Sequence, residues 1–108
     1  MKNGIELIAE ERQRQIAEEG WTPEHDDEHS TGELALVASF YAMAEQQRLE
    51  ELITDSITPP TGFPWDAEWW KPTPENRVRE LQKAGALIAA EIDRLNRLNR
   101  ELTKKERH

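Results

Sequence analysis

Cysteine is absent from this 108-residue chain. A disulfide framework, a thiolate zinc site and a cysteine nucleophile are therefore excluded. Long apolar runs are absent too, since no segment approaches the roughly 20 apolar residues that a membrane-spanning helix needs. The N-terminus also lacks the uninterrupted apolar stretch of a signal peptide. We therefore expect a cytoplasmic protein that does not act in a membrane.

Basic residues are scarce relative to acidic ones, with 14 Lys and Arg against 22 Asp and Glu and a formal net charge of −8. Such an acidic protein is not expected to bind nucleic acid nonspecifically, because phosphates attract basic surfaces. The charge is unevenly spread, since residues 94–108 hold six bases and two acids. This polarity allows the end of the chain to lie near the acidic first third, in the same chain or in a partner subunit.

Alternating apolar runs and hairpin turns are missing as well, so no β-strand is predicted. Helical periodicity predicts three main helices, over residues 5–19, from 34 to about 53, and from 73 to about 104. Thr73-Pro74 is the predicted start of the last helix, as its N-cap and first residue. We expect an all-α fold, a single helical bundle domain over residues 1–108, with a Pro- and Trp-rich loop before the last helix.

Two of these helices indicate a homo-oligomer. The second predicted helix is apolar on nearly opposite sides, so it is either the central element of the fold or half of an oligomer interface. The last helix carries one clean apolar stripe that includes Asn99, where a polar group can fix register or oligomer state. The two sets on the second helix are Leu34, Val37, Ala38, Tyr41 and Leu52, and Leu36, Phe40 and Met43; the stripe on the last helix is Val78, Leu81, Gly85, Ile88, Ile92, Leu95 and Leu102.

Arg12 lies within the apolar stripe of the first predicted helix, among Ile5, Ile8, Ala9 and Ile16. Its long stem can pack against neighbours while its charged head reaches water. If the guanidinium is buried instead, it requires a carboxylate partner. The candidate partners are Glu33, Glu45 and Glu91.

Residues 20–33, GWTPEHDDEHSTGE, concentrate ionisable groups between the first two predicted helices. Thr22 and Pro23 fit the N-cap and first position of a short helical turn. Ser30 and Glu33 fit a capping box, in which the Glu33 side chain reaches back to the Ser30 amide. This stretch is therefore expected to set the geometry between two helices.

The same stretch is also a candidate metal site. Oxygen ligands suit hard cations and imidazole suits borderline ones, so Asp26 or Asp27 with His29 could begin such a site. Glu33 and, from the last helix, Glu91 complete the candidate set of ligands for magnesium or manganese. The simpler interpretation is that acids before a helix N-terminus only favour its macrodipole.

Residues 54–73, TDSITPPTGFPWDAEWWKPT, break the helical pattern with four of the six prolines and three of the four tryptophans. One interpretation is a structured loop whose aromatic side chains seal one end of the bundle. The other is a recognition surface, because tryptophan faces stack on bases or grip a partner protein. The candidate ligand-binding residues are Trp65, Trp69, Trp70 and Lys71, with Arg12 and Arg77 as further cations.

Several short segments together carry a resemblance that covers most of the chain. They are Glu11-Arg12 with Gln15, Glu19-Gly20-Trp21, Glu24-His25-Asp26-Asp27, His29 with Gly32-Glu33-Leu34-Ala35, Pro64-Trp65-Asp66, Trp69-Trp70-Lys71-Pro72, Lys83-Ala84-Gly85-Ala86-Leu87-Ile88 and Ala90-Glu91-Ile92. On these segments the chain resembles a group of short helical proteins encoded by bacteriophages and prophages. The resemblance implies an accessory role in a mobile element.

A more distant similarity is to the MazG-like all-α nucleotide pyrophosphohydrolases, which are acidic helical oligomers. The similarity implies hydrolysis of nucleoside triphosphates with magnesium held by helical carboxylates, in the pattern Glu-x-x-Glu on one helix and Glu-x-x-Asp on a later one. Here Glu91 and Asp93 are two positions apart, and Glu33 stands alone at the start of the second predicted helix.

Two functions follow as competing hypotheses. The first is a binding protein that captures a host protein or a nucleotide-like ligand with the loop from Trp65 to Lys71 and with Arg12 or Arg77. The second is a metal-dependent nucleotide pyrophosphohydrolase, in which Glu33, Glu91 and the acidic stretch hold magnesium or manganese and the metal activates water. The incomplete acidic pattern favours the binding protein.

Overall fold

The structure, a computed structural model, describes residues 1–44, 46–48 and 58–106. The described part is mainly helical and contains no strand, so the predicted all-α class is confirmed. No helix of the described residues is long and apolar enough to cross a membrane. The elements are α1 (Gly4–Glu18), α2 (Pro23–Asp27), α3 (Glu33–Ala42), the 3₁₀ turn η1 (Ala67–Trp69) and α5 (Arg77–Glu106).

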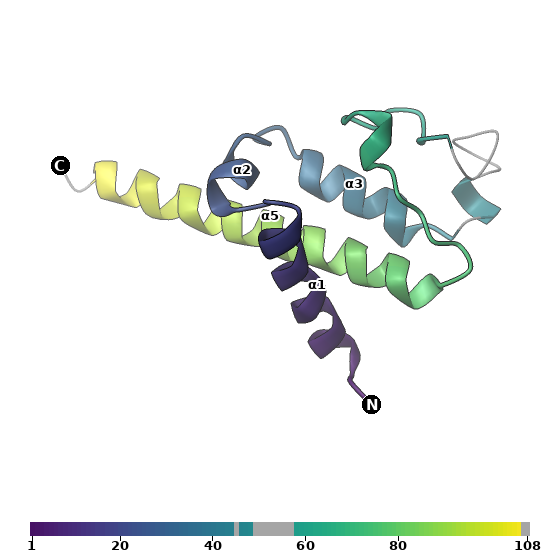
Figure 1. The fold of residues 1–108 in the computed structure, drawn as a ribbon. Helices are drawn as coiled ribbons and strands as arrows, with labels where there is room; N and C mark the ends of the chain where they lie inside the picture. Colours follow the sequence, from purple (N-terminus) through teal and green to yellow (C-terminus); the bar gives the residue numbers. More distant parts are fainter. Residues whose placement is uncertain (45, 49–57, 107–108) are drawn as a thin grey trace.

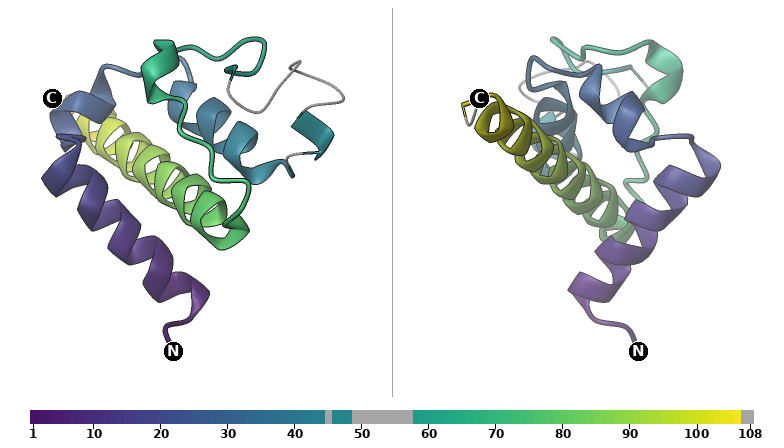
Figure 2. Two further views of the ribbon diagram at one scale, coloured as in Figure 1. Left: turned by 45° about the vertical axis from the view of Figure 1, so that its right-hand side comes forward. Right: turned by 90° about the vertical axis from the view of Figure 1, so that its left-hand side faces the viewer.

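The long helix α5 is the element on which the others assemble. Helices α1, α2 and α3 each pack against it (Figure 1). Helix α1 crosses its flank (Figure 2), and the Ile8 side chain lies so close to Gly85 that a Cβ atom there would come within 2.5 Å of Ile8 Cδ1. Gly85 therefore permits the approach of α1.

Local capping residues explain where the helices begin. Asn3 and Glu6 form a capping box at the start of α1, which was not predicted. At the start of α2 the Thr22 hydroxyl accepts a hydrogen bond from the His25 amide, and this cap was predicted. The predicted start of the last helix at Thr73 is wrong. Instead, the Asn76 side chain accepts a hydrogen bond from the Arg79 amide, so α5 begins at Arg77. Thr73 lies in the preceding turn.

The second predicted helix ends far earlier than expected, at Ala42. Met43 is extended, with φ −67° and ψ 139°. The Arg77 guanidinium donates to the carbonyls of Tyr41, Ala42 and Met43. The Arg77 guanidinium thus satisfies carbonyls that the helix itself leaves unpaired, and the chain leaves the helical conformation at Met43. A continuous helix to residue 53 is therefore wrong, and Leu52 lies outside the described residues.

The core lies between α3 and α5 and does not use the predicted α5 stripe. Val78 and Leu81 of that stripe are 57% and 46% exposed. The buried apolar residues of α5 are three alanines and Leu87, and the alanines let neighbouring helices approach closely. The buried core residues are Trp21, Leu34, Val37, Ala38, Phe40, Tyr41, Trp70, Ala84, Leu87 and Ala90.

One apolar side of α3 is buried within the chain, and the other is covered in part. On the second side Phe40 is buried and Met43 is half-buried against the core, whereas Leu36 is 41% exposed. Most of the apolar surface of α3 is therefore covered by the described residues of the same chain. The described residues leave α5, rather than α3, as the helix with an uncovered apolar face.

A buried ion pair joins Arg48, in the segment that follows α3, to the start of α5. Arg48 Nη2 lies 2.9 Å from Glu80 Oε2, and the two side chains are 2% and 0% exposed. Arg48 also donates to the carbonyls of Phe40 and Met43, while Glu80 accepts bonds from the Thr73 amide and from Arg77. The pair is thus embedded in a hydrogen-bond network.

We expect Glu80→Gln to destabilise the fold by about 3–5 kcal/mol, because it leaves the buried Arg48 guanidinium without its counter-charge. Glu75→Gln, at an exposed position in the turn that precedes α5, is the control and should change stability by less than about 0.5 kcal/mol. Urea unfolding of both variants measures the difference. Equal, small effects would show that the pair does not anchor α3 to α5.

Candidate functional site

A buried ion pair between α1 and α2 supports one wall of a pocket lined by aromatic side chains. Arg12 Nη2 lies 2.8 Å from Asp26 Oδ2, and Asp26 is fully buried. Arg12 also donates to the Trp21 carbonyl at 3.4 Å, and Asp26 Oδ1 lies 3.1 Å from His25 Nδ1. Arg12 is therefore buried with a carboxylate, which comes from neither Glu33 nor Glu91 of the predicted partners. The third predicted partner, Glu45, lies outside the described residues.

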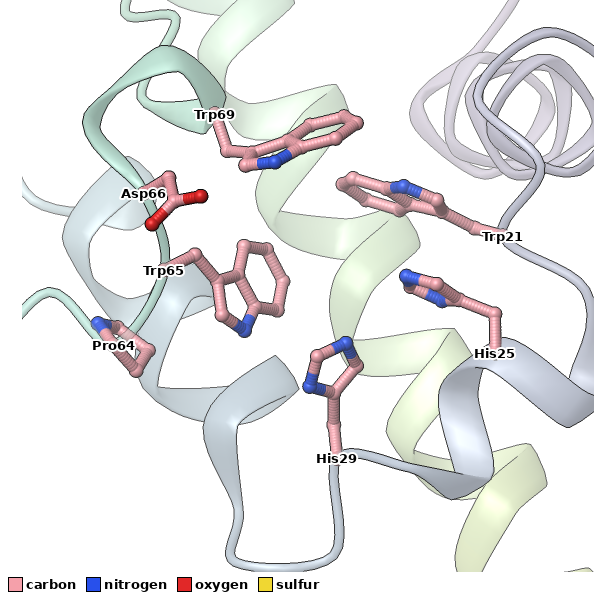
Figure 3. A pocket seen from close by; sticks show the side chains of 7 residues that line it. All are labelled: Trp21, His25, His29, Pro64, Trp65, Asp66 and Trp69. Atoms are coloured by element: carbon pink, nitrogen blue, oxygen red, sulfur yellow. The ribbon is translucent and has the colours of Figure 1, made fainter.

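Aromatic side chains from two distant parts of the chain enclose this pocket, whose volume is about 310 Å³. Figure 3 shows their rings directed toward one space, from the α1–α2 connection and α2 on one side and from the loop and η1 on the other. Of the predicted ligand-binding residues, the pocket brings together Trp65 and Trp69. Its lining residues are Trp21, His25, His29, Pro64, Trp65, Asp66 and Trp69.

The rings of the pocket support one another at angles, so that they form walls rather than a single stack. Trp21 lies parallel to His25 with ring centroids 5.7 Å apart, and it meets Trp65 edge-on at 69°. Trp69 is tilted by 51° to Trp21 at 6.0 Å. Edge-to-face and offset pairs of this kind are stabilising, which fixes the pocket before any ligand enters.

The polar groups of the pocket lining are the imidazole nitrogens, the indole N–H of Trp65 and the carboxylate of Asp66. His25 and His29 each place Nδ1 against a carboxylate, of Asp26 at 3.1 Å and of Glu33 at 2.7 Å. In a neutral imidazole that contact puts the proton on Nδ1 and makes Nε2 an acceptor. Trp65 Nε1 has no hydrogen-bond partner among the described atoms, and the carboxylate of Asp66 lies at the pocket edge.

Glu33 organises the loop behind His29, although not in the predicted capping box. The N-cap of α3 is Gly32, at φ 85°, and not Ser30. Glu33 accepts bonds from the Thr31 amide at 2.9 Å and from the Thr31 hydroxyl. The hydrogen bond from the Thr31 hydroxyl lowers the pKa of Glu33 to about 2, together with the hydrogen bonds from His29 and from the Thr31 amide. Glu33 therefore reaches back one residue later than predicted.

The other predicted ligand-binding residues lie outside the pocket. Trp70 is buried and stacks on Tyr41, with ring centroids 4.7 Å apart, and Arg77 caps the end of α3. Lys71 Nζ lies 5.3 Å from the Trp69 ring centroid, on a neighbouring narrow cleft that also contains Glu19. Lys71 thus brings positive charge beside a pocket wall.

The predicted metal ligands are distributed over separate contacts. Asp26 pairs with Arg12, Asp27 pairs with Arg97, and Glu91 lies 2.6 Å from Arg94. His29 and Glu33 contact each other. Across residues 1–44, 46–48 and 58–106, no group of three His, Asp or Glu side chains has an arrangement that could hold a metal ion.

Comparison of the chain with protein-family models, with curated proteins and with solved structures found no match. The site therefore has to be interpreted from its own geometry.

Trp21, His25, Pro64 and Asp66 line the pocket without having been predicted as ligand-binding residues. A signal for two of them was present in the sequence. Trp21 and His25 are four positions apart and flank the Thr22-Pro23 cap, so a helical turn there places their rings on one side. The position of Asp66 depends on the loop conformation, which helical periodicity does not describe.

The low pKa of Glu33 gives the fold a defined acid sensitivity. Because the pKa falls from 4.5 to about 2 on folding, the Glu33 contribution is complete above about pH 4.5 and is lost as the pH falls toward 2. We expect Glu33→Gln to cost roughly 1 kcal/mol at pH 6 and much less at pH 2. Thermal melts across this range measure it, with the exposed Glu28→Gln as control. A pH-independent difference would contradict the assignment.

Proposed function

We propose that this protein binds a nucleotide-like ligand whose planar base enters the aromatic pocket. The observation that carries the proposal is the convergence of three indole and two imidazole rings on one space of about 310 Å³. This volume lies at the lower end of the range of about 300–1,000 Å³ typical of small-molecule sites. The pocket therefore suits a base with its sugar rather than a large cofactor.

Stacking would supply most of the affinity. Trp21, Trp65 and Trp69 present faces and edges in different orientations, so a flat ring system can lie on one indole while its rim meets another. Each base stacked on an aromatic side chain contributes about 1–3 kcal/mol as measured by alanine substitution, and every base has such a face. Stacking alone gives little discrimination between bases.

Hydrogen bonding would give orientation. Asp66 is an acceptor for an exocyclic amine or ring N–H, and the His Nε2 atoms are further acceptors when the imidazoles are neutral. A phosphate is better placed away from Asp66 and toward Lys71, which lies beside Trp69 and is exposed. Lys71 Nζ lies 3.8 Å from Glu19 Oε1, so a phosphate would compete with that carboxylate for the ammonium group. The ligand would then run from the pocket across the Trp69 wall.

The alternative function, a metal-dependent nucleotide pyrophosphohydrolase, stays a prediction. Its candidate ligands Asp26, Asp27 and Glu91 have arginine partners, which would have to be displaced before a cation could bind. A host protein as the captured partner, a mobile-element role and a cytoplasmic location also stay predictions. None of them is needed for the pocket to bind a nucleotide-like ligand.

Isothermal titration with purine and pyrimidine nucleoside 5′-monophosphates tests the proposal, with ribose 5-phosphate as the ligand that lacks a base. We expect binding only when the base is present, accompanied by quenching of tryptophan fluorescence. Trp69→Ala should weaken binding roughly 5- to 150-fold, which corresponds to the loss of about 1–3 kcal/mol of stacking.

Glu68→Ala is the matched control variant, since Glu68 is exposed on the same turn η1 and does not line the pocket. It should leave the affinity unchanged. Absence of heat and of quenching with every nucleotide at millimolar concentration would contradict the proposal. Equal binding of ribose 5-phosphate would show that the pocket does not read the base.

A further inference from the structure

The apolar stripe of α5 faces away from the core and is uncovered along much of its length. Ile92 and Leu95 are 53% and 42% exposed, and Ile88, Leu98 and Leu102 are exposed to a similar degree. Figure 1 shows the C-terminal end of α5 extending beyond α2, and all side chains from 98 to 104 are exposed. A short helical segment without tertiary packing is only marginally stable in water, so this end of α5 favours a partner.

The spacing of the stripe matches a coiled coil. The sequence positions 78, 81, 85, 88, 92, 95, 99 and 102 alternate steps of three and four residues, which is the heptad seam of two supercoiled helices. Asn99 occupies one seam position, where a polar residue is tolerated for its effect on register. The seam continues without a break over more than three heptads. Its periodicity therefore specifies another helix, and not a flat surface, as the occupant.

The positions beside the seam are almost free of charge. Between residues 81 and 103 only Glu91 is ionisable among them, and it lies against Arg94 of its own helix. A partner helix of the same sequence would therefore meet no row of like charges along these positions. These positions are Gln82, Ala84, Ala89, Glu91, Asn96, Leu98 and Thr103.

The charge distribution is complementary to itself when two copies lie head to tail. Residues 94–108 carry six bases and two acids, a net charge of +4, so the remaining chain carries −8 − 4 = −12. A parallel pair would bring the two basic ends together and the two acidic bodies together. An antiparallel pair places each basic end on the acidic body of the other copy, which lowers the electrostatic energy.

We propose that a second copy of this chain covers the α5 stripe, with the two α5 helices antiparallel. The interface uses Ile88, Ile92, Leu95 and Leu102, because α1 already covers part of the helix near Gly85 through Ile8. The pairing is independent of the aromatic pocket, since none of these four residues lines it.

Sedimentation velocity of the full chain at micromolar concentration tests the interface. We expect the wild type to sediment as a dimer and Leu95→Glu to sediment as a monomer with its helical circular dichroism largely retained. Asp93→Asn changes the charge by one unit at an exposed position outside both the seam and the positions beside it, and this variant should remain a dimer. A monomeric wild type, or a Leu95→Glu variant that remains dimeric, would overturn the proposal.

The absence of native cysteine allows the orientation to be tested with single cysteines. Disulfides require Cα atoms within about 7 Å of each other. In an antiparallel pair the two copies of residue 102 lie toward opposite ends, so Leu102→Cys should not cross-link on oxidation. A covalent dimer of Leu102→Cys would establish a parallel pair and overturn the antiparallel arrangement.

Discussion

The buried Arg12–Asp26 ion pair is the interaction on which the candidate site depends. Its two residues lie on α1 and α2, and each also holds a residue of the pocket wall: Arg12 donates to the Trp21 carbonyl, and Asp26 contacts the His25 ring. α2 has only five residues, too short to be stable by itself. The ion pair therefore holds both the short helix and the orientation of two pocket rings.

A second buried ion pair, between Arg48 and Glu80, lies at the start of α5. Buried pairs of this kind stabilise a fold less than their Coulomb energy suggests, because both charges must leave water. Their geometric requirement is strict, however. The two pairs therefore specify the position of α2 against α1 and of the end of α3 against α5, beside the apolar core.

The sequence predicted the helical class and the α2 cap, because periodicity and capping are local properties. It misplaced the end of the second helix, since the guanidinium of Arg77 that satisfies the α3 carbonyls comes from more than 30 residues away in sequence. It also named Trp65 and Trp69 but not the opposing wall with Trp21. That wall is recognisable only when the position of α2 relative to η1 is known. The Arg12–Asp26 ion pair holds α2 in place, and the sequence alone does not show which of several carboxylates pairs with Arg12.

A double-mutant cycle on Arg12 and Asp26 tests whether this ion pair supports both the fold and the pocket, with the free energy of unfolding and the nucleotide affinity measured on each protein. We expect Arg12→Leu and Asp26→Leu each to destabilise the fold by about 3–5 kcal/mol, since each leaves one buried charge unpaired. The double variant should then be much less destabilised than the sum, and it should bind nucleotide weakly because Trp21 and His25 have lost their support. Small, additive changes in stability with unaltered nucleotide affinity would contradict it.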